Sequence, residues 1–245
     1  MKLFGITRIR NEKDIIWDTL NHWGALCTGG IFVYDDKSTD NTVKLCRSHP
    51  SVKEVVCGKI WDSDRARAEF QNRQTALLAA LRYTSPDDWI VYFDADEFLY
   101  EFDINKLSDP ISGVRCRLFD VYITENNKML TWKTRDTIGP EYRDILFFFK
   151  VSSIIGYQFP DQRECSLKSG STIVQHGYIK HYGKGFSVAQ WESACEYYSK
   201  HFPMYSKKWE ARKGKAIHTK SDFGADLISF SDVLKGSEKG FPLKH

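Results

Sequence analysis

WIVYFDADE, residues 89–97, is an apolar run that becomes acidic without an intervening loop. A short apolar run of this kind is typical of a buried strand, so we expect a strand over residues 89–93. Asp94 and Asp96 follow it one residue apart, and two carboxylates at a strand end can face one hard cation, which prefers oxygen ligands. The same pair is also explained by a solvated acidic turn, because short motifs recur by chance.

In front of this stretch, apolar runs alternate with segments of helical periodicity. That alternation predicts an α/β fold with a mostly parallel sheet flanked by helices. Ligands of such sheets bind beyond the carboxyl ends of the strands, so we expect the polar loops after the strands to meet at one crevice. The predicted strands are residues 2–7, 31–34 and 52–57, and the predicted helices are residues 13–26, 41–48 and 65–83.

The second half of the chain follows a different pattern, with longer polar segments between apolar ones. It predicts strands over residues 114–123, 145–151 and 171–175, a helix over 187–198, and a dense polar turn over 139–144 that is either an acceptor loop or a plain connection. We interpret residues 1–245 as a single domain. Residues 1–110 form its nucleotide-sugar-binding half, and residues 111–245 form a smaller antiparallel and helical acceptor-binding half with a C-terminal tail.

Composition excludes several classes of protein. The net charge is +3 on 35 basic and 32 acidic residues, a balance unlike that of a nucleic-acid binder. The six cysteines form no C-x-x-C pair, which argues against a zinc or redox motif. There is no apolar run of membrane-spanning length and no secretory pattern at the N-terminus, so we expect a cytoplasmic protein without a transmembrane segment.

Four segments together resemble a known family. They are RIRNE at residues 8–12, DDKSTDNT at 35–42, QNR at 71–73 and DADEF at 94–98. In this order and spacing the chain resembles the GT-A glycosyltransferases, especially the inverting family 2. The resemblance implies a GT-A (Rossmann-like) fold and transfer of a sugar from a nucleotide-diphosphate sugar to an acceptor hydroxyl, such as that of a glycan. It also implies a divalent metal, Mn²⁺ or Mg²⁺, with a UDP-sugar as the default donor.

Roles for individual residues follow from the same resemblance. Asp96 would ligate the metal, and Asp94 would contact the ribose or water around the ion. A late histidine would complete the metal shell, with His181 the first choice and His176 the second. The remaining nucleotide-sugar contacts would come from Thr7, Arg8, Asp36 (or, less favoured, Asp35), Arg65 and Arg67.

The catalytic base is where the sequence departs from the family pattern. Inverting transfer needs a carboxylate to take the proton of the acceptor hydroxyl, and no acidic pair opens a helix after residue 96. The nearest substitute is FPDQRE at residues 159–164, with Asp161 as the first choice and Glu164 as the second. Asp120 and Asp144 are further alternatives, and Arg163 is alternatively an ion-pair partner for one of these acids. This gap leaves inversion or retention open.

Two other functions compete with this interpretation. A sugar nucleotidyltransferase uses a similar sheet and metal carboxylates, but it would open with a Gly-rich loop, and residues 3–11 contain only Gly5. A non-catalytic nucleotide- or carbohydrate-binding protein on a GT-A scaffold has no need for Asp94 and Asp96 together.

Overall fold

The chain divides into two compact units. The computed structural model describes residues 1–59, 62–158 and 163–243. The first unit comprises residues 1–116 and 145–177, and the second comprises residues 117–144 and 178–245. Residues 145–177 thus belong with the first unit, although the sequence interpretation placed them in the second half; whether the chain is a single domain stays a prediction.

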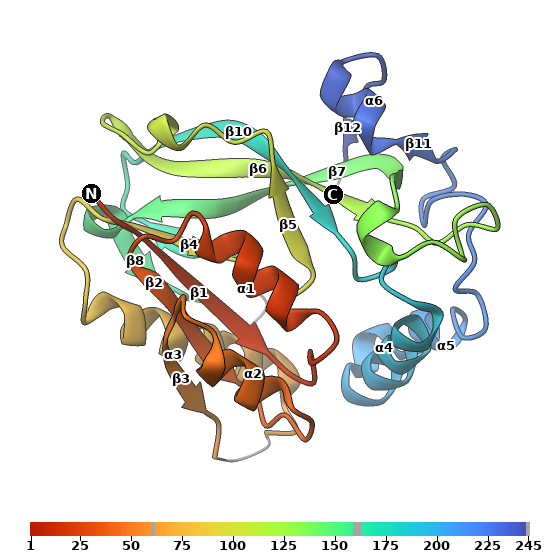
Figure 1. The fold of residues 1–245 in the computed structure, drawn as a ribbon, viewed down its shortest axis with the longest axis horizontal. Coiled ribbons are helices and arrows are strands. Elements are labelled where there is room, and N and C mark those ends of the chain that lie inside the picture. The colour runs from red at the N-terminus through yellow and green to blue at the C-terminus, as the bar shows by residue number, and fades with distance from the viewer. Residues whose placement is uncertain (60–61, 159–162, 244–245) are drawn as a thin grey trace. The chain divides into compact units, whose positions relative to one another are not determined.

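The first unit contains the predicted alternation of strands and helices (Figure 1). Its own elements are β1 (Leu3–Ile9), α1 (Ile16–Gly24), β2 (Gly30–Asp35), α2 (Thr42–Ser48), β3 (Val52–Cys57), α3 (Arg65–Leu81), β4 (Trp89–Tyr92), β5 (Glu97–Tyr100), β8 (Ile154–Gly156) and β9 (Ser166–Leu167). Three strands contribute to both units, β6 (Ile111–Val121), β7 (Thr137–Lys150) and β10 (Thr172–His181). The main sheet has the strand order β3-β2-β1-β4-β7-β6-β10-β5, and β8 pairs with β9 in a small antiparallel sheet.

The strand order explains where the helices lie. β1, β2 and β3 are parallel neighbours, and β4 pairs parallel with β1 on its other side. Right-handed crossovers that step outward from β1 to β3 and then return to β4 place α1 and α2 on one face and α3 on the other. Figure 1 shows this arrangement, with α1 and α2 in front of the strands and α3 behind them. The carboxyl ends of β1, β2 and β4 therefore lie together at one edge.

Burial on both faces of these strands fixes the arrangement. Phe4, Phe32 and Ile90 from three strands pack against Ala76 and Leu77 of α3 in one core cluster. Central strands of this kind read as continuous apolar runs because both of their faces are covered, which is why the sequence identified them.

Helix α1 also positions the acidic turn that follows β4. Trp23 stacks on Phe93, with 4.6 Å between ring centroids, and its Nε1 donates to the carbonyl of Glu97 at 2.8 Å. The hydroxyl of Thr19 donates to the carbonyl of Ala95. These contacts hold the backbone of residues 94–97 without involving the carboxylates of Asp94 and Asp96.

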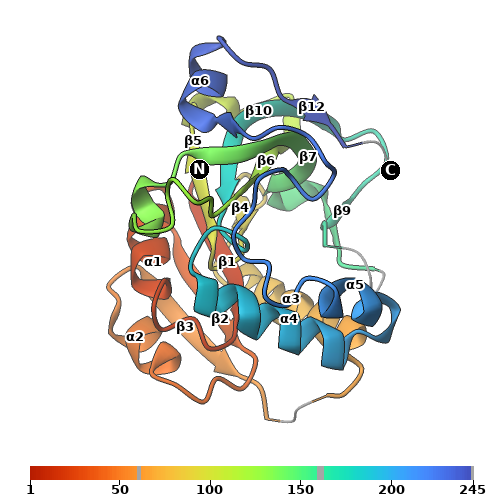
Figure 2. The ribbon, with the colours of Figure 1, turned by 90° about the vertical axis from the view of Figure 1, so that its right-hand side faces the viewer.

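The second unit is built on the far half of β7. β11 (Ile228–Ser229) pairs antiparallel with β7 at Ile138, and β12 (Phe241–Pro242) pairs parallel with it at Glu141 and Tyr142. Its helices are α4 (Val188–His201), α5 (Ser206–Glu210) and α6 (Phe230–Lys235), and Figure 2 shows α4 beside α5. Short 3₁₀ turns cover Ile104–Lys106, Trp132–Thr134, Val151–Ser153 and Pro203–Tyr205.

The polar turn predicted over residues 139–144 is wrong, because these residues lie inside β7. Their polarity suggested a turn, yet Pro140, Glu141 and Tyr142 are all buried, and the pairing with β11 and β12 extends the strand. Such pairing joins residues far apart in sequence and leaves no local periodicity. Among the described helices, none has the length and apolar character needed to cross a membrane.

Candidate active site

Two arginines converge on Asp36 at the carboxyl end of β2. Nη1 of Arg8, near the end of β1, donates to Oδ2 of Asp36 at 3.2 Å, and Nη2 of Arg65, the first residue of α3, contacts the same oxygen. Asp36 is only 3% exposed. Its Oδ1 accepts no hydrogen bond from any residue in the described part of the chain. The structure thus brings together Arg8, Asp36 and Arg65, and leaves one oxygen of Asp36 without a hydrogen bond from the described residues.

Asp35 has a different task. Its two carboxylate oxygens accept the backbone N–H of Ser38 at 3.1 and 3.3 Å, which closes the turn after β2. Arg10 donates to the carbonyl of Asp36 at 2.7 Å and braces the same turn. The geometry therefore separates Asp35, which forms the turn, from Asp36, which pairs with the two arginines.

The helix face that carries Arg65 extends these contacts to further charged residues. Glu69 accepts from Nη2 of Arg8 and from Nη2 of Arg73, each at 3.2 Å. Arg73 is 8% exposed, and its Nε donates to the hydroxyl of Tyr92 at 3.2 Å. Arg73 thus joins the contacts around Asp36, although the sequence interpretation gave it no functional role. Glu69 and Tyr92 also take part, and the sequence interpretation did not name them.

Arg163 links the network to the acidic turn. Tyr92 donates to Oδ1 of Asp94 at 2.6 Å, while Nη1 of Arg163 lies 3.2 Å from Oδ2 of Asp94. Nη2 of Arg163 donates to Oε2 of Glu97 at 2.5 Å, and the same oxygen accepts the backbone N–H of Asp94 at 2.9 Å. We call this set the arginine–carboxylate network; its members are Arg8, Asp36, Arg65, Glu69, Arg73, Tyr92, Asp94, Glu97 and Arg163.

The network holds Asp94 in its charged form. Burial alone would raise the pKa of Asp94, but Arg163, Arg73 and the hydrogen bond from Tyr92 outweigh it and lower that pKa to about 2. Asp94 is therefore an anion at any physiological pH. The alternative that Arg163 pairs with Asp120, Asp144, Asp161 or Glu164 is not what the described residues show, since its ion-pair partners there are Asp94 and Glu97.

A second acidic group lies at the same edge of the sheet. The backbone N–H of Glu12 is held by the hydroxyl of Thr42 at 2.8 Å, and its carboxylate accepts no hydrogen bond from the described residues. Burial, together with the nearby charges of Asp96 and Asp94, raises the pKa of Glu12 to about 8. Three carboxylates thus lie close enough to repel one another, a feature the sequence interpretation missed because it gave Glu12 no role.

Carboxylate oxygens are the donors that Mg²⁺ and Mn²⁺ prefer, and at Glu12 burial and the charges of Asp96 and Asp94 together outweigh the opposing charge of Arg8. The donor chemistry therefore fits a divalent cation at Asp96, with Asp94 and Glu12 nearby. Within residues 1–59, 62–158 and 163–243, however, no three His, Cys, Asp or Glu side chains are arranged as a coordination shell.

The other predicted residues of the first unit are placed differently. Thr7 is fully buried and its hydroxyl has no hydrogen-bond partner among the described residues, so a ligand would reach it only after local repacking. The side chain of Arg67 is 55% exposed and forks onto Asp62, with Nη2 2.9 Å from Oδ2. Their nucleotide contacts stay predictions, and the geometry favours Arg65 over Arg67.

The two residues predicted as the catalytic base, Asp161 and Glu164, differ in what the structure says of them. Asp161 lies outside the described residues. Glu164 lines a cavity of about 390 Å³, but both its oxygens accept from Arg115, at 2.8 and 2.6 Å, so it would have to leave that ion pair to take a proton. Its role as base stays a prediction.

His181 belongs to an ionic cluster of the second unit. Its Nδ1 lies 2.6 Å from Oδ1 of Asp120. Arg143 also contacts Oδ1, and Lys184 contacts Oδ2, each at 2.8 Å. Burial alone would raise the pKa of Asp120, but Lys184, Arg143 and His181 hold it well below its usual range, so Asp120 is a poor base. Nδ1 donates to Asp120, and a metal could bind His181 only through Nε2; this role stays a prediction.

The pKa of Glu12 makes the stability of the protein depend on pH. Folding raises this pKa from 4.5 to about 8, so the folded protein holds a proton that the unfolded chain releases, and the free energy of unfolding falls as pH rises between these values. We expect Glu12→Gln to be more stable than the wild type at pH 8.5 by about 1–2 kcal/mol, after allowance for screening by water, and equal to it at pH 4.5.

Denaturant unfolding at pH 4.5, 6.5 and 8.5 measures this difference. Glu125→Gln, a variant of a glutamate whose side chain is 71% exposed, is the matched control and should follow the wild type at every pH. Parallel curves for Glu12→Gln and the wild type would contradict the assigned pKa. Mn²⁺ should raise the free energy of unfolding of the wild type at pH 8.5. It should raise that of Glu12→Gln less.

Comparison with known proteins gives a family match over more than half of the chain. A family model described as Glycosyl transferase family 2 matches residues 6–165, which contain the second half of β1, β2 to β4 and every member of the arginine–carboxylate network. A curated Mycobacterium tuberculosis protein described as uncharacterized is 28% identical over 130 residues, 47% of this chain. The chain spans only 30% of the length of that relative.

Solved structures show weaker similarity. TarS of S. aureus (residues 1–349) is 12% identical at a TM-score of 0.41, with 86% of this chain and 68% of that chain covered. A glucosyl-3-phosphoglycerate synthase of Mycobacterium tuberculosis, in complex with Mn²⁺, UDP and glucosyl-3-phosphoglycerate, is 16% identical at a TM-score of 0.39, over 82% of this chain and 80% of that chain.

Proposed function

Since the chain belongs to glycosyl transferase family 2 and has the GT-A fold, we propose that it transfers a sugar from a nucleoside-diphosphate sugar to an acceptor hydroxyl. One observation carries this proposal. Glu12, Asp94 and Asp96 form an electronegative edge beside the arginine-anchored Asp36, all within the residues that the family matches. A hard cation suits the first group, and a nucleoside suits the second.

Asp36 would recognise the nucleoside. Its Oδ2 is neutralised by Arg8 and Arg65, so Oδ1 can accept a hydrogen bond from a ribose hydroxyl or a base N–H without leaving a buried charge unpaired. The family resemblance makes uridine the default base. Arg65, fixed by Asp36 and by the carbonyl of Asp62 at 3.1 Å, keeps this carboxylate in one orientation.

Asp96 and Asp94 would hold Mn²⁺ or Mg²⁺, which when bound would neutralise charge on the departing diphosphate. The surrounding residues would contribute by holding these carboxylates in place. Tyr92 and Arg163 fix Asp94 as an anion, and the contacts of α1 hold the turn so that the acidic edge is formed before the donor arrives. The base, for which Asp161 stays the first choice, would take the proton of the acceptor hydroxyl in an inverting transfer.

Nucleotide binding gives the direct test. We expect one of UDP, GDP, dTDP and CDP, with UDP the default, to raise the Tm in the presence of Mn²⁺. The expected shift is about 5 °C or more when the nucleotide is present at about a hundredfold excess over its own Kd. The same nucleotide without metal should give a much smaller shift. Asp36→Asn should weaken the shift for every nucleotide, since it removes the anionic acceptor.

The controls separate the competing functions. Asp87→Asn, at an aspartate whose side chain is 84% exposed, should leave the nucleotide shift unchanged. A screen in which no nucleotide changes the Tm under any metal condition would overturn the proposal. A metal-dependent shift without any donor hydrolysis or transfer would favour the non-catalytic binding protein.

A further inference from the structure

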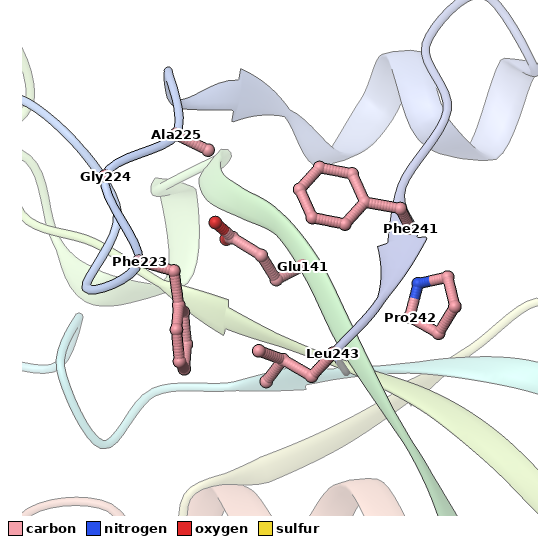
Figure 3. Close-up of a pocket in the computed structure, with 7 residues that line it drawn as sticks. All are labelled: Glu141, Phe223, Gly224, Ala225, Phe241, Pro242 and Leu243. Atoms are coloured by element: carbon pink, nitrogen blue, oxygen red, sulfur yellow. The ribbon is translucent and has the colours of Figure 1, made fainter. Parts of the chain in front are cut away.

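A cavity of about 470 Å³ opens within the second unit, beside the edge of β7 (Figure 3). It lies where β12 runs along β7 and the segment 223–225 crosses the same edge. Its walls are apolar except for one carboxylate, as the lining residues show: Glu141, Phe223, Gly224, Ala225, Phe241, Pro242 and Leu243.

Glu141 is the polar group of this cavity. It is only 7% exposed, and Figure 3 shows its carboxylate between Phe223 and Phe241. The hydroxyl of Ser221 donates to Oε1 at 2.6 Å and accepts the backbone N–H of Ala225 at 3.1 Å. One oxygen of Glu141 is therefore fixed by a turn whose shape also forms the cavity wall.

The second carboxylate oxygen of Glu141 has no such partner in the described part of the chain. Within the described residues, Oε2 of Glu141 accepts no hydrogen bond, and no cationic side chain pairs with the carboxylate. A buried carboxylate without a counter-charge is costly, and its cost is relieved when a cation binds. The aromatic walls favour the same ligand: Phe223 and Phe241 are 57% and 48% exposed, and aromatic faces attract ammonium groups.

We propose that this cavity binds a primary ammonium group carried on a ring-sized organic molecule. The need of Oε2 for an N–H donor excludes a quaternary ammonium, and a primary ammonium offers the most donors and the least bulk. The volume accommodates a single ring. On the basis of the proposed function, the ligand class is an amino sugar, and the cavity is a subsite for an amine-bearing acceptor.

Paired probes in which a neutral hydroxyl replaces the ammonium group test the proposal. Glucosamine is compared with glucose, and cyclohexylamine with cyclohexanol, by isothermal titration and by amide chemical-shift changes at pH 7. We expect each amine to bind at least about tenfold more tightly than its neutral partner, equivalent to ~1.4 kcal/mol. Glu141→Gln, which keeps the shape of the side chain, should remove this preference.

Two further variants make the result specific. Ala225→Leu fills the cavity without changing its charge and should abolish binding of both amines. Glu210→Gln, at a glutamate of the same unit whose side chain is 55% exposed, should bind them as the wild type does. Equal binding of charged and neutral probes, or an unchanged preference in Glu141→Gln that folds normally by circular dichroism, would overturn the proposal.

The nucleotide shift is recorded on the same variants. Amine binding without any nucleotide shift would leave the ammonium site standing and remove the proposed function. Binding of cyclohexylamine but not of glucosamine would overturn the amino-sugar assignment. Binding of both amines, with a nucleotide shift that Glu141→Gln leaves unchanged, would support the whole proposal.

Discussion

Asp96→Asn is expected to lower kcat/KM for sugar transfer by about a thousandfold while the protein stays folded. Removing one group that stabilises charge developing on a leaving group has an effect of this order. Asp96 is partly exposed at the turn after β4, and its charge reaches Glu12 across the acidic edge. The turn itself is held by Trp23 and Thr19 through backbone carbonyls, and Asp96→Asn leaves both of these contacts in place.

The measurement is steady-state transfer or donor hydrolysis with the nucleotide sugar that the binding screen selects. Asp87→Asn is the control, and its rate should equal that of the wild type. A rate for Asp96→Asn within tenfold of the wild type, at an unchanged Tm, would show that the cation and the leaving diphosphate do not depend on this residue. The pKa of Glu12 supplies a second readout, because loss of the Asp96 charge should lower it.

The sequence predicted the part of the site that follows from strand topology. Apolar runs identified β1, β2 and β4, and parallel strands bring their carboxyl ends to one edge. Arg8 and Asp36, which lie at two of these ends, could therefore be expected to meet although they are far apart in sequence.

The sequence interpretation failed where contacts depend on helix phase. Arg65, Glu69 and Arg73 are spaced four residues apart and so lie on one face of α3, whereas Arg67 points elsewhere. This spacing was a usable signal: it separates the buried arginines from the exposed Arg67, and it includes Glu69, which bridges Arg8 and Arg73.

Long-range pairing left no comparable signal. Arg163 contacts Glu97 although the two are 66 residues apart in sequence. No local motif around either residue predicts the other as its partner. Glu141 was assigned to a turn for the same reason, because its strand is extended by pairing with β11 and β12. Local propensity describes segments well and describes ion pairs between segments poorly.

Arg163→Met is expected to destabilise the protein by about 3–5 kcal/mol at pH 7, because it leaves buried carboxylates without their cation. Glu97 has no solvent exposure, and Asp94 loses the positive group that contributes most to lowering its pKa. In the wild type this lowered pKa stabilises the fold fully above pH 3.8, and the stabilisation is lost as pH falls toward 2. Without Arg163, burial should raise the pKa of Asp94 above its ordinary value of 3.8, so the deficit should shrink as pH falls from 7 to 4.

Urea unfolding at pH 4, 5.5 and 7 measures this difference. Arg67→Met is the matched control: it breaks an exposed fork with Asp62 and should leave the free energy of unfolding within error of the wild type. Glu97→Gln in the Arg163→Met background should recover part of the loss at pH 7, since it removes one of the stranded charges. Equal effects of Arg163→Met and Arg67→Met, or a deficit that does not change with pH, would show that Arg163 packs beside these carboxylates without neutralising them.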